Sequence, residues 1–133
     1  MSPERADTRP CGAPGSGRAR LGSMQKFSLD ALGREHLERA AANPAGRSAE
    51  TVYGGHEHVL RQTVLALRAG TELSEHDNPG EASVLVLRGR VRLVSGEDAW
   101  DAMAGDLLAI PPARHSLEAL EDSVIVLTVA KLA

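Results

Sequence analysis

The segment GTELSEHDNPGEASVLVLRG, residues 70–89, combines a candidate ligand site with the pattern of a strand. His76 is followed two residues later by Asn78, and a carboxylate, Glu81, comes shortly after. Residues two apart on a strand point to the same face, so side chains at 76 and 78 would converge on one point. The run ASVLVLR is β-branched and apolar, which is typical of a buried strand. The segment therefore predicts strands that carry His76.

Strand-like runs surround this segment on both sides, and no helical period separates them. ETVY and HEHVLRQTVLALR come before it, and GRVRLVS, AWDAM, LLAIPP, SLEAL and VIVLTVAK come after it. Turns containing Gly, Asp, Asn or Pro divide them into about seven to nine short strands. VIVLTV lacks polar alternation, which predicts a strand covered on both faces. The pattern indicates a mainly β fold, an antiparallel sandwich or barrel.

Composition and spacing divide the chain into three regions. Residues 1–23 are rich in Gly, Pro, Arg and Ser and carry few large apolar side chains, so we expect a disordered tail. Residues 24–48 should form an N-terminal α-helix and a linker, and residues 49–133 the β-barrel. Ser28 is a suitable N-cap for this helix, and an Asn-Pro pair should end it. We interpret the histidine of the apolar stripe as a half-buried packing residue; the stripe consists of Leu29, Leu32, His36, Leu37 and Ala40.

The composition excludes several classes of protein. A chain of 133 residues suits one domain. Its 15 basic residues are scattered among 18 acidic ones, for a net charge of −3, which argues against a nucleic-acid surface. Cys11 is the only cysteine, so neither an intramolecular disulfide nor a cysteine-based zinc site can form. No apolar run reaches the roughly 20 residues that a bilayer requires, and no secretory signal is evident, so we expect a cytoplasmic protein without a membrane partner.

Two motifs in the chain resemble those of small single-domain cupins, a family of double-stranded β-helix or RmlC-like jelly-roll barrels. In the first motif a glycine is followed after five residues by a histidine, and in the second a glycine is followed after five residues by a proline. The landmarks are Gly70, His76 and Gly89 in the first motif and Gly105, Pro111 and His115 in the second. The resemblance covers about residues 50–132. It implies a cupin barrel on which the N-terminal helix packs as an addition.

The resemblance also implies a divalent transition metal, Mn, Fe, Ni, Zn or Cu, held by histidines and a carboxylate. His76 and His115 stand at two of the ligand positions. Asn78 stands at the second histidine position of the first motif, and an amide is a poor ligand for such metals. The carboxylate position holds Ala82. Glu81 is adjacent, but on a regular strand it would face the other way, so it joins the site only through a bulge.

A second source of ligands is the HEH sequence at the start of the preceding strand. If His58 faced the interior it would replace the missing histidine, and Gln62 would follow on the same face of that strand. The alternative interpretation leaves His58 exposed at the barrel rim. We therefore predict a ligand pocket from His58, Gln62, His76, Asn78 and His115, and metal ligands among His76, His115, His58 and Glu81. The remaining polar candidates are Arg61, Arg88 and Arg114.

Three functions are compatible with these residues. The favoured hypothesis is a barrel that binds an unknown small molecule, since the metal set is incomplete. The alternative is a metal-dependent enzyme of the oxygenase or isomerase class that uses His76, His115 and either His58 or Glu81. The third hypothesis is a barrel whose main task is to associate with other chains, because the single-domain cupins that this chain resembles are usually dimers. We expect a homodimer whose interface uses the helix at 28–43 and the strand VIVLTV.

Overall fold

A computed structural model describes residues 24–76, 80–110 and 112–131, with the side chains of residues 75 and 76 left out. The tail predicted for residues 1–23 and the predicted pocket residue Asn78 lie outside these ranges. One helix precedes nine strands in the described part of the chain. They are α1 (Leu29–Ala42), β1 (Arg47–Tyr53), β2 (Leu60–Leu67), β3 (Glu72–His76), β4 (Gly80–Arg88), β5 (Arg90–Ser95), β6 (Asp98–Met103), β7 (Leu107–Ala109), β8 (His115–Ala119) and β9 (Ser123–Lys131).

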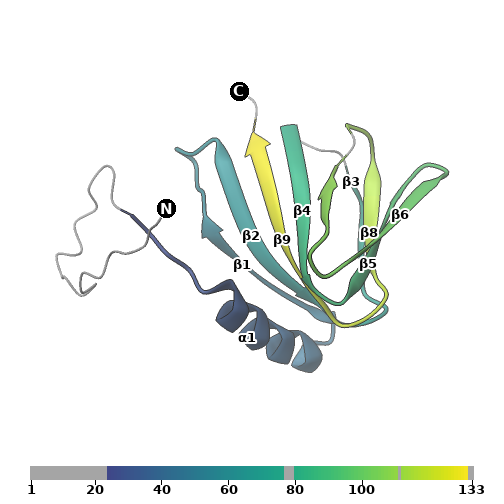
Figure 1. The fold of residues 1–133 in the computed structure, drawn as a ribbon, viewed down its shortest axis with the longest axis horizontal. Coiled ribbons are helices and arrows are strands. Elements are labelled where there is room, and N and C mark those ends of the chain that lie inside the picture. The colour runs from purple at the N-terminus through teal and green to yellow at the C-terminus, as the bar shows by residue number, and fades with distance from the viewer. Residues whose placement is uncertain (1–23, 77–79, 111, 132–133) are drawn as a thin grey trace.

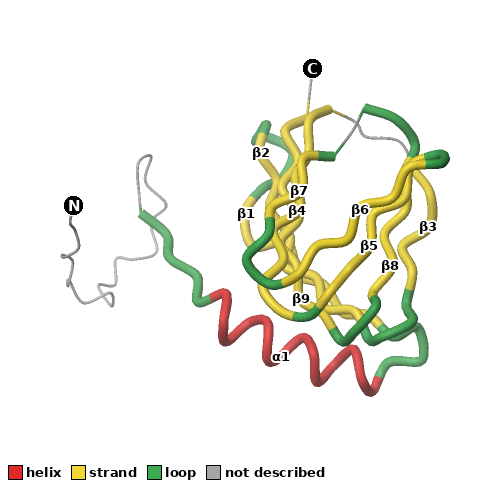
Figure 2. Tube along the Cα trace, turned by 45° about the vertical axis from the view of Figure 1, so that its right-hand side comes forward, coloured by secondary structure: helices red, strands yellow, loops and turns green. Residues whose placement is uncertain are grey.

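The strands form two sheets that face each other (Figure 1). One sheet has the order β1-β2-β9-β4-β7 and the other has the order β3-β8-β5-β6. Neighbouring strands are antiparallel throughout the described pairs. Figure 2 shows the two sheets curving around a common interior. Helix α1 lies outside this interior, at the end of the barrel away from the C-terminus of the chain. The mainly β jelly-roll barrel predicted from the two motifs is confirmed.

Aliphatic side chains from both sheets fill the interior. Alternate residues of β2 and β4 point inward from one sheet, and alternate residues of β5 and β8 point inward from the other. Burying each such Val or Leu stabilises the fold by roughly 1.5–3 kcal/mol. The buried members of this interior core are Leu65, Leu67, Val84, Val86, Val91, Leu93, Ala102, Ile110, Leu117, Ala119 and Ile125.

The outer face of the larger sheet is covered by α1. Val64 of β2 and Val124 and Val126 of β9 pack against the apolar stripe of the helix. The closest approach is at Gly33, where an added Cβ would lie 3.2 Å from Cγ1 of Val124. The strand VIVLTV is therefore covered on both faces, as its sequence predicts. The helix and this strand bury each other within one chain, while the other face of the helix is exposed. The homodimer stays a prediction.

Local hydrogen bonds fix the start and the orientation of α1. Ser28 Oγ accepts a hydrogen bond from the backbone N–H of Ala31 at 3.2 Å, as expected for its N-cap. His36 is 2% exposed, more deeply buried than the sequence suggests. Its Nδ1 lies 2.7 Å from Ser48 Oγ and its Nε2 lies 2.9 Å from Glu50 Oε1. His36 therefore ties the helix to β1. Within the described residues, α1 is too short to reach across a bilayer.

The turn between β4 and β5 explains why the first motif closes with a glycine. Gly89 has φ = +82°, a conformation that costs other residues about 1–2 kcal/mol. A Cβ at this position would also lie 2.3 Å from the carbonyl oxygen of Asp122 and 2.4 Å from Ser123 Oγ. Ser123 is fully buried, and its hydroxyl accepts from the N–H of Arg90 at 3.1 Å. Gly89 is thus required both by its backbone conformation and by the space around it.

Candidate functional site

The two cupin-like motifs bring His76 and His115 to neighbouring strand positions. β3 and β8 are paired so that the Cα of His76 lies opposite the Cα of His115, after a register shift that begins at Leu73. His115 is 5% exposed and shares the inward face of β8 with Leu117. Its Nδ1 lies 3.0 Å from the carbonyl oxygen of Ala113. The imidazole of His115 is therefore part of the interior, and the backbone of His76 is paired with the backbone of His115.

Glu81 lies on the other face of its strand from the interior. β4 and β9 are paired without a shift from Gly80 to Val86, so the bulge needed to turn Glu81 inward is not present there. Ala82 packs against the interior core, and Glu81 is exposed. The structure therefore does not bring this predicted metal ligand to His115, because side chains alternate between the two faces of a regular strand.

His58 lies in the loop between β1 and β2 at the rim of the barrel. Its backbone N–H donates to the carbonyl oxygen of Gly55 at 3.2 Å, which makes a tight turn. The half-buried imidazole lies against the ring of Tyr53, with a centroid distance of 4.8 Å and an interplanar angle of 41°. Across the described residues, no three His, Cys, Asp or Glu side chains gather closely enough to hold a metal ion.

Gln62 differs from the sequence expectation, because it faces away from the interior. Its Nε2 donates to Thr128 Oγ1 at 3.3 Å on the outer face of the larger sheet. Val64 follows on the same face and packs toward α1. The inward face of β2 carries the odd-numbered residues instead, as the burial of Leu65 in the interior core shows.

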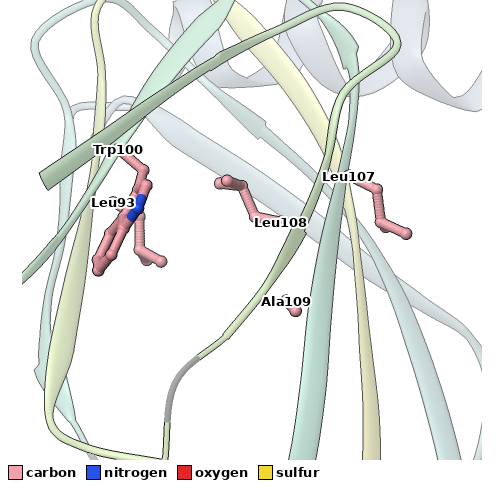
Figure 3. A pocket seen from close by; sticks show the side chains of 5 residues that line it. All are labelled: Leu93, Trp100, Leu107, Leu108 and Ala109. Atoms are coloured by element: carbon pink, nitrogen blue, oxygen red, sulfur yellow. The ribbon is translucent and has the colours of Figure 1, made fainter.

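An apolar cleft of about 280 Å³ opens between the two sheets, and we call it the Trp100 cleft. Figure 3 shows Trp100 beside Leu93, with Leu108 extending toward them from β7. Trp100 is 44% exposed, so its indole lies at the opening. Ala102 belongs to the interior core, and Trp100 shares its face of β6. The lining residues are Leu93, Trp100, Leu107, Leu108 and Ala109.

Comparison with known proteins identifies solved structures that share this architecture. No family model and no curated protein sequence matches the chain. A cupin superfamily protein from Desulfitobacterium hafniense has a similar structure, with 14% identity, a TM-score of 0.60, and coverage of 65% of this chain and 78% of that chain. The domain has the cupin fold.

Two other solved structures share this cupin architecture. A conserved protein of unknown function from Streptococcus pyogenes is 25% identical, with a TM-score of 0.62 and coverage of 68% of this chain and 79% of that chain. A salicylate 1,2-dioxygenase from Pseudaminobacter salicylatoxidans is 19% identical, with a TM-score of 0.64. That alignment covers 75% of this chain but only 33% of the dioxygenase chain.

Among the donors whose side chains the structure describes, no group of three converges as the divalent metal implied by the cupin motifs would require, and the imidazole of His76 is not among those side chains. His115 is inside the barrel, whereas Glu81 is outside it and His58 packs against Tyr53 in the rim loop. A transition-metal site of this kind requires at least two histidines and a carboxylate that converge. No such group is present in the described part of the cupin domain.

The Trp100 cleft was not found from the sequence. Alternation along AWDAM places Trp100 and Ala102 on one face, so the sequence indicates one wall of the cleft. The other wall is formed by β7, whose Leu108 pairs with Val84 of β4. A three-residue strand carries too little periodicity to predict a partner far away in the chain.

The outward face of β6 is held by an ion pair rather than by apolar contacts. Arg92 binds Asp101 with two hydrogen bonds, Nε to Oδ1 at 2.7 Å and Nη2 to Oδ2 at 3.2 Å. The hydrogen bond from Arg92, with a smaller contribution from Arg90, holds the pKa of Asp101 below its ordinary value of 3.8. This pair anchors the strand that carries Trp100 on the side opposite to the cleft.

Proposed function

We propose that this cupin domain binds one small molecule inside the barrel. The apolar part of the ligand occupies the Trp100 cleft, and its polar part points toward the rim of the barrel, on the side where His115 begins β8. The observation that carries the proposal is a cleft lined by apolar side chains from both sheets, with an indole at its opening. Small-molecule sites typically combine an apolar lining with few polar groups and have volumes of roughly 300–1,000 Å³. The Trp100 cleft, at about 280 Å³, is just below the lower end of that range.

The geometry of the smaller sheet connects the cleft to the histidine. Leu93 in the cleft pairs directly with Leu117 of β8. His115 lies two residues before Leu117 on the same face of that strand, which corresponds to roughly 6–7 Å along the strand. A ligand of modest length therefore spans from the indole of Trp100 to the imidazole of His115.

The chain has one tryptophan, so a direct test is available. The indole N–H of Trp100 gives a single signal in a ¹H–¹⁵N correlation spectrum, which can be followed during a screen of small aromatic and aliphatic fragments. We expect fragments to shift this signal with saturation. Leu108→Gln keeps the size of the side chain but places an amide in the cleft, and we expect it to weaken binding at least tenfold.

Leu60→Gln is the matched control, because Leu60 lies on the outward face of β2, next to Gln62, and is 37% exposed. It should leave fragment affinity unchanged. If no fragment shifts the indole signal at millimolar concentration, or if Leu108→Gln and Leu60→Gln have equal effects, the cleft is not the binding site.

A metal-dependent enzyme of the oxygenase or isomerase class is the second candidate. The register that places the Cα of His76 opposite that of His115 favours it, because both motif histidines then lie on adjacent strands. The similarity of the fold to a salicylate 1,2-dioxygenase supports the same class. Of the four ligands predicted from the sequence, Glu81 lies on the outer face of its strand and His58 packs against Tyr53 in the rim loop.

Elemental analysis of protein purified without a histidine tag tests this second candidate. A stoichiometric transition metal that is lost in His76→Ala and in His115→Ala would support it. Protein that holds less than a tenth of an equivalent and refuses Mn, Fe, Ni, Zn and Cu when each is added back would exclude it. Glu81→Ala is a useful comparison, because this exposed carboxylate should not affect metal content.

A further inference from the structure

Arg61 is a half-buried residue on the inward face of β2. β2 and β9 are paired without a shift from Leu60 to Leu67, so the two faces alternate regularly along the strand. Arg61 therefore shares its face with Leu65 and Leu67, which belong to the interior core. Arg61 lies four residues before Leu65, toward the rim of the barrel.

No hydrogen bond or ion pair joins the guanidinium of Arg61 to any other residue that the structure describes. Most other arginines of the described region are engaged. Those paired with carboxylates are Arg34, Arg39, Arg88, Arg90 and Arg92. Arg68 donates to the carbonyl oxygen of Ala41. An arginine at the rim whose guanidinium has no described partner is available to bind a ligand, because a guanidinium presents several hydrogen-bond donors.

The surroundings of Arg61 hold its aliphatic part and leave its head group for a ligand. A Cβ at Gly54 would lie 3.0 Å from both the Cα and the Cγ of Arg61, so the Gly54 backbone packs directly on the side-chain stem. Lys131, whose strand ends near the same loop, donates from Nζ to the carbonyl oxygen of Gly55 at 3.0 Å. Lys131 thus secures the rim loop, whereas Arg61 has no comparable structural contact.

Arg61 and the Trp100 cleft belong to the same inner wall. Arg61 pairs with Val129 of β9, and Val129 pairs with Ala82 of β4. Two residues further along β4, Val84 pairs with Leu108 of the cleft. β2 and β7 are three strand spacings apart, about 14 Å at roughly 4.8 Å per spacing. The long side chain of Arg61 shortens the span that a ligand must cover.

We propose that the small molecule is a carboxylate with an apolar body, and that Arg61 binds the carboxylate while the Trp100 cleft holds the body. This inference rests on the proposed function and names its ligand class. A guanidinium forms two parallel hydrogen bonds with a carboxylate, which suits one unpaired arginine and one negative charge. Phosphate groups usually require several donors, such as successive backbone N–H groups or a helix N-terminus.

The test compares benzoate with benzamide, which have the same size and shape but differ in charge. Affinities are measured from the indole N–H signal of Trp100 in the full-length protein. We expect benzoate to bind at least tenfold more tightly than benzamide. Arg61→Gln should remove that preference and leave benzamide binding unchanged, and Arg61→Lys should restore part of it. Arg39→Gln, on the exposed side of α1, is the control for a general change in charge.

A second variant tests whether the position of Arg61 matters. Gly54→Ala places a methyl group against Cα and Cγ of Arg61, which must then shift. We expect this variant to weaken benzoate binding several-fold and to leave benzamide binding unchanged. The wild-type comparison of the two probes stands by itself if a variant fails to fold.

The outcomes separate this inference from the proposed function. Equal affinities for benzoate and benzamide, or a benzoate preference that survives Arg61→Gln, would overturn the carboxylate assignment and leave the cleft as a binding site. Phenyl phosphate binding more tightly than benzoate through Arg61 would overturn it in favour of a phosphate. If neither benzoate, benzamide nor any fragment shifts the indole signal, both the inference and the proposed function fail.

Discussion

At the end of the barrel beside α1, buried polar groups are bonded within the chain, whereas the inward-facing Arg61 near the rim has no partner in the described structure. His36 uses both ring nitrogens, toward Ser48 and Glu50, and the fully buried Ser123 bonds to the backbone of Arg90 at the neighbouring turn. Arg61 has no such bonds, although it is half-buried. The difference indicates that the end beside α1 stabilises the fold. The rim, in contrast, carries an arginine that can bind another molecule.

Gly89→Ala should have the largest effect, because it directly disrupts the end of the barrel beside α1. The added Cβ would lie 2.3 Å from the carbonyl oxygen of Asp122, and the backbone has φ = +82°. We expect a loss of about 3 kcal/mol or more in the free energy of unfolding, measured by urea denaturation.

Gly105→Ala is its control, since Gly105 has a similar φ of +94° but no atom within 4 Å of an added Cβ. It should cost only the conformational penalty of about 1–2 kcal/mol. Equal losses for the two variants would show that steric overlap at Gly89 contributes nothing.

His36→Ala should have the second-largest effect. It leaves a cavity at a residue that is 2% exposed and removes the hydrogen bonds that tie α1 to β1. We expect a loss of about 2–4 kcal/mol in the free energy of unfolding. His56→Ala, at an exposed position of the rim loop, should change it by less than about 0.5 kcal/mol. A loss at His36 no greater than that at His56 would mean that the clamp is unimportant.

The sequence predicted the fold better than the site because the two depend on different kinds of information. Gly89 is required by a local backbone conformation and by contact with one turn, so its spacing within the motif is visible in the sequence. The inward face of β2 is not visible in this way. HEHVLRQTVLALR is apolar at positions of both parities, so only the packing of α1 on Val64 shows that Gln62 faces outward and Arg61 inward.

Arg61→Leu should have a smaller effect of opposite sign. Replacing Arg61 by an aliphatic side chain removes no described hydrogen bond or ion pair, so we expect unfolding stability to be unchanged or to rise by about 0–1 kcal/mol. Benzoate binding should be lost in the same variant. Thermal denaturation with and without benzoate measures both effects. A loss of more than about 1 kcal/mol would show that Arg61 has a structural role like that of His36, and the contrast between the two ends would disappear.

The smallest effect should come from the exposed ion pair on the outward face of β6. The hydrogen bond from Arg92 lowers the pKa of Asp101 in the folded state, so the carboxylate contributes stability above its unfolded value of 3.8. This contribution is lost as the pH falls below 3.8 through the folded pKa. Asp101→Asn should therefore lose less stability than wild type over that acidic window, and high salt should weaken the difference, because the pair is exposed to solvent.

Urea midpoints measured at neutral pH and through the acidic window test this expectation, with Asp98→Asn on the same strand as the control. Parallel pH profiles for wild type and Asp101→Asn would contradict a stabilising role for the Arg92–Asp101 pair, while leaving Trp100 and the interior face of β6 unaffected.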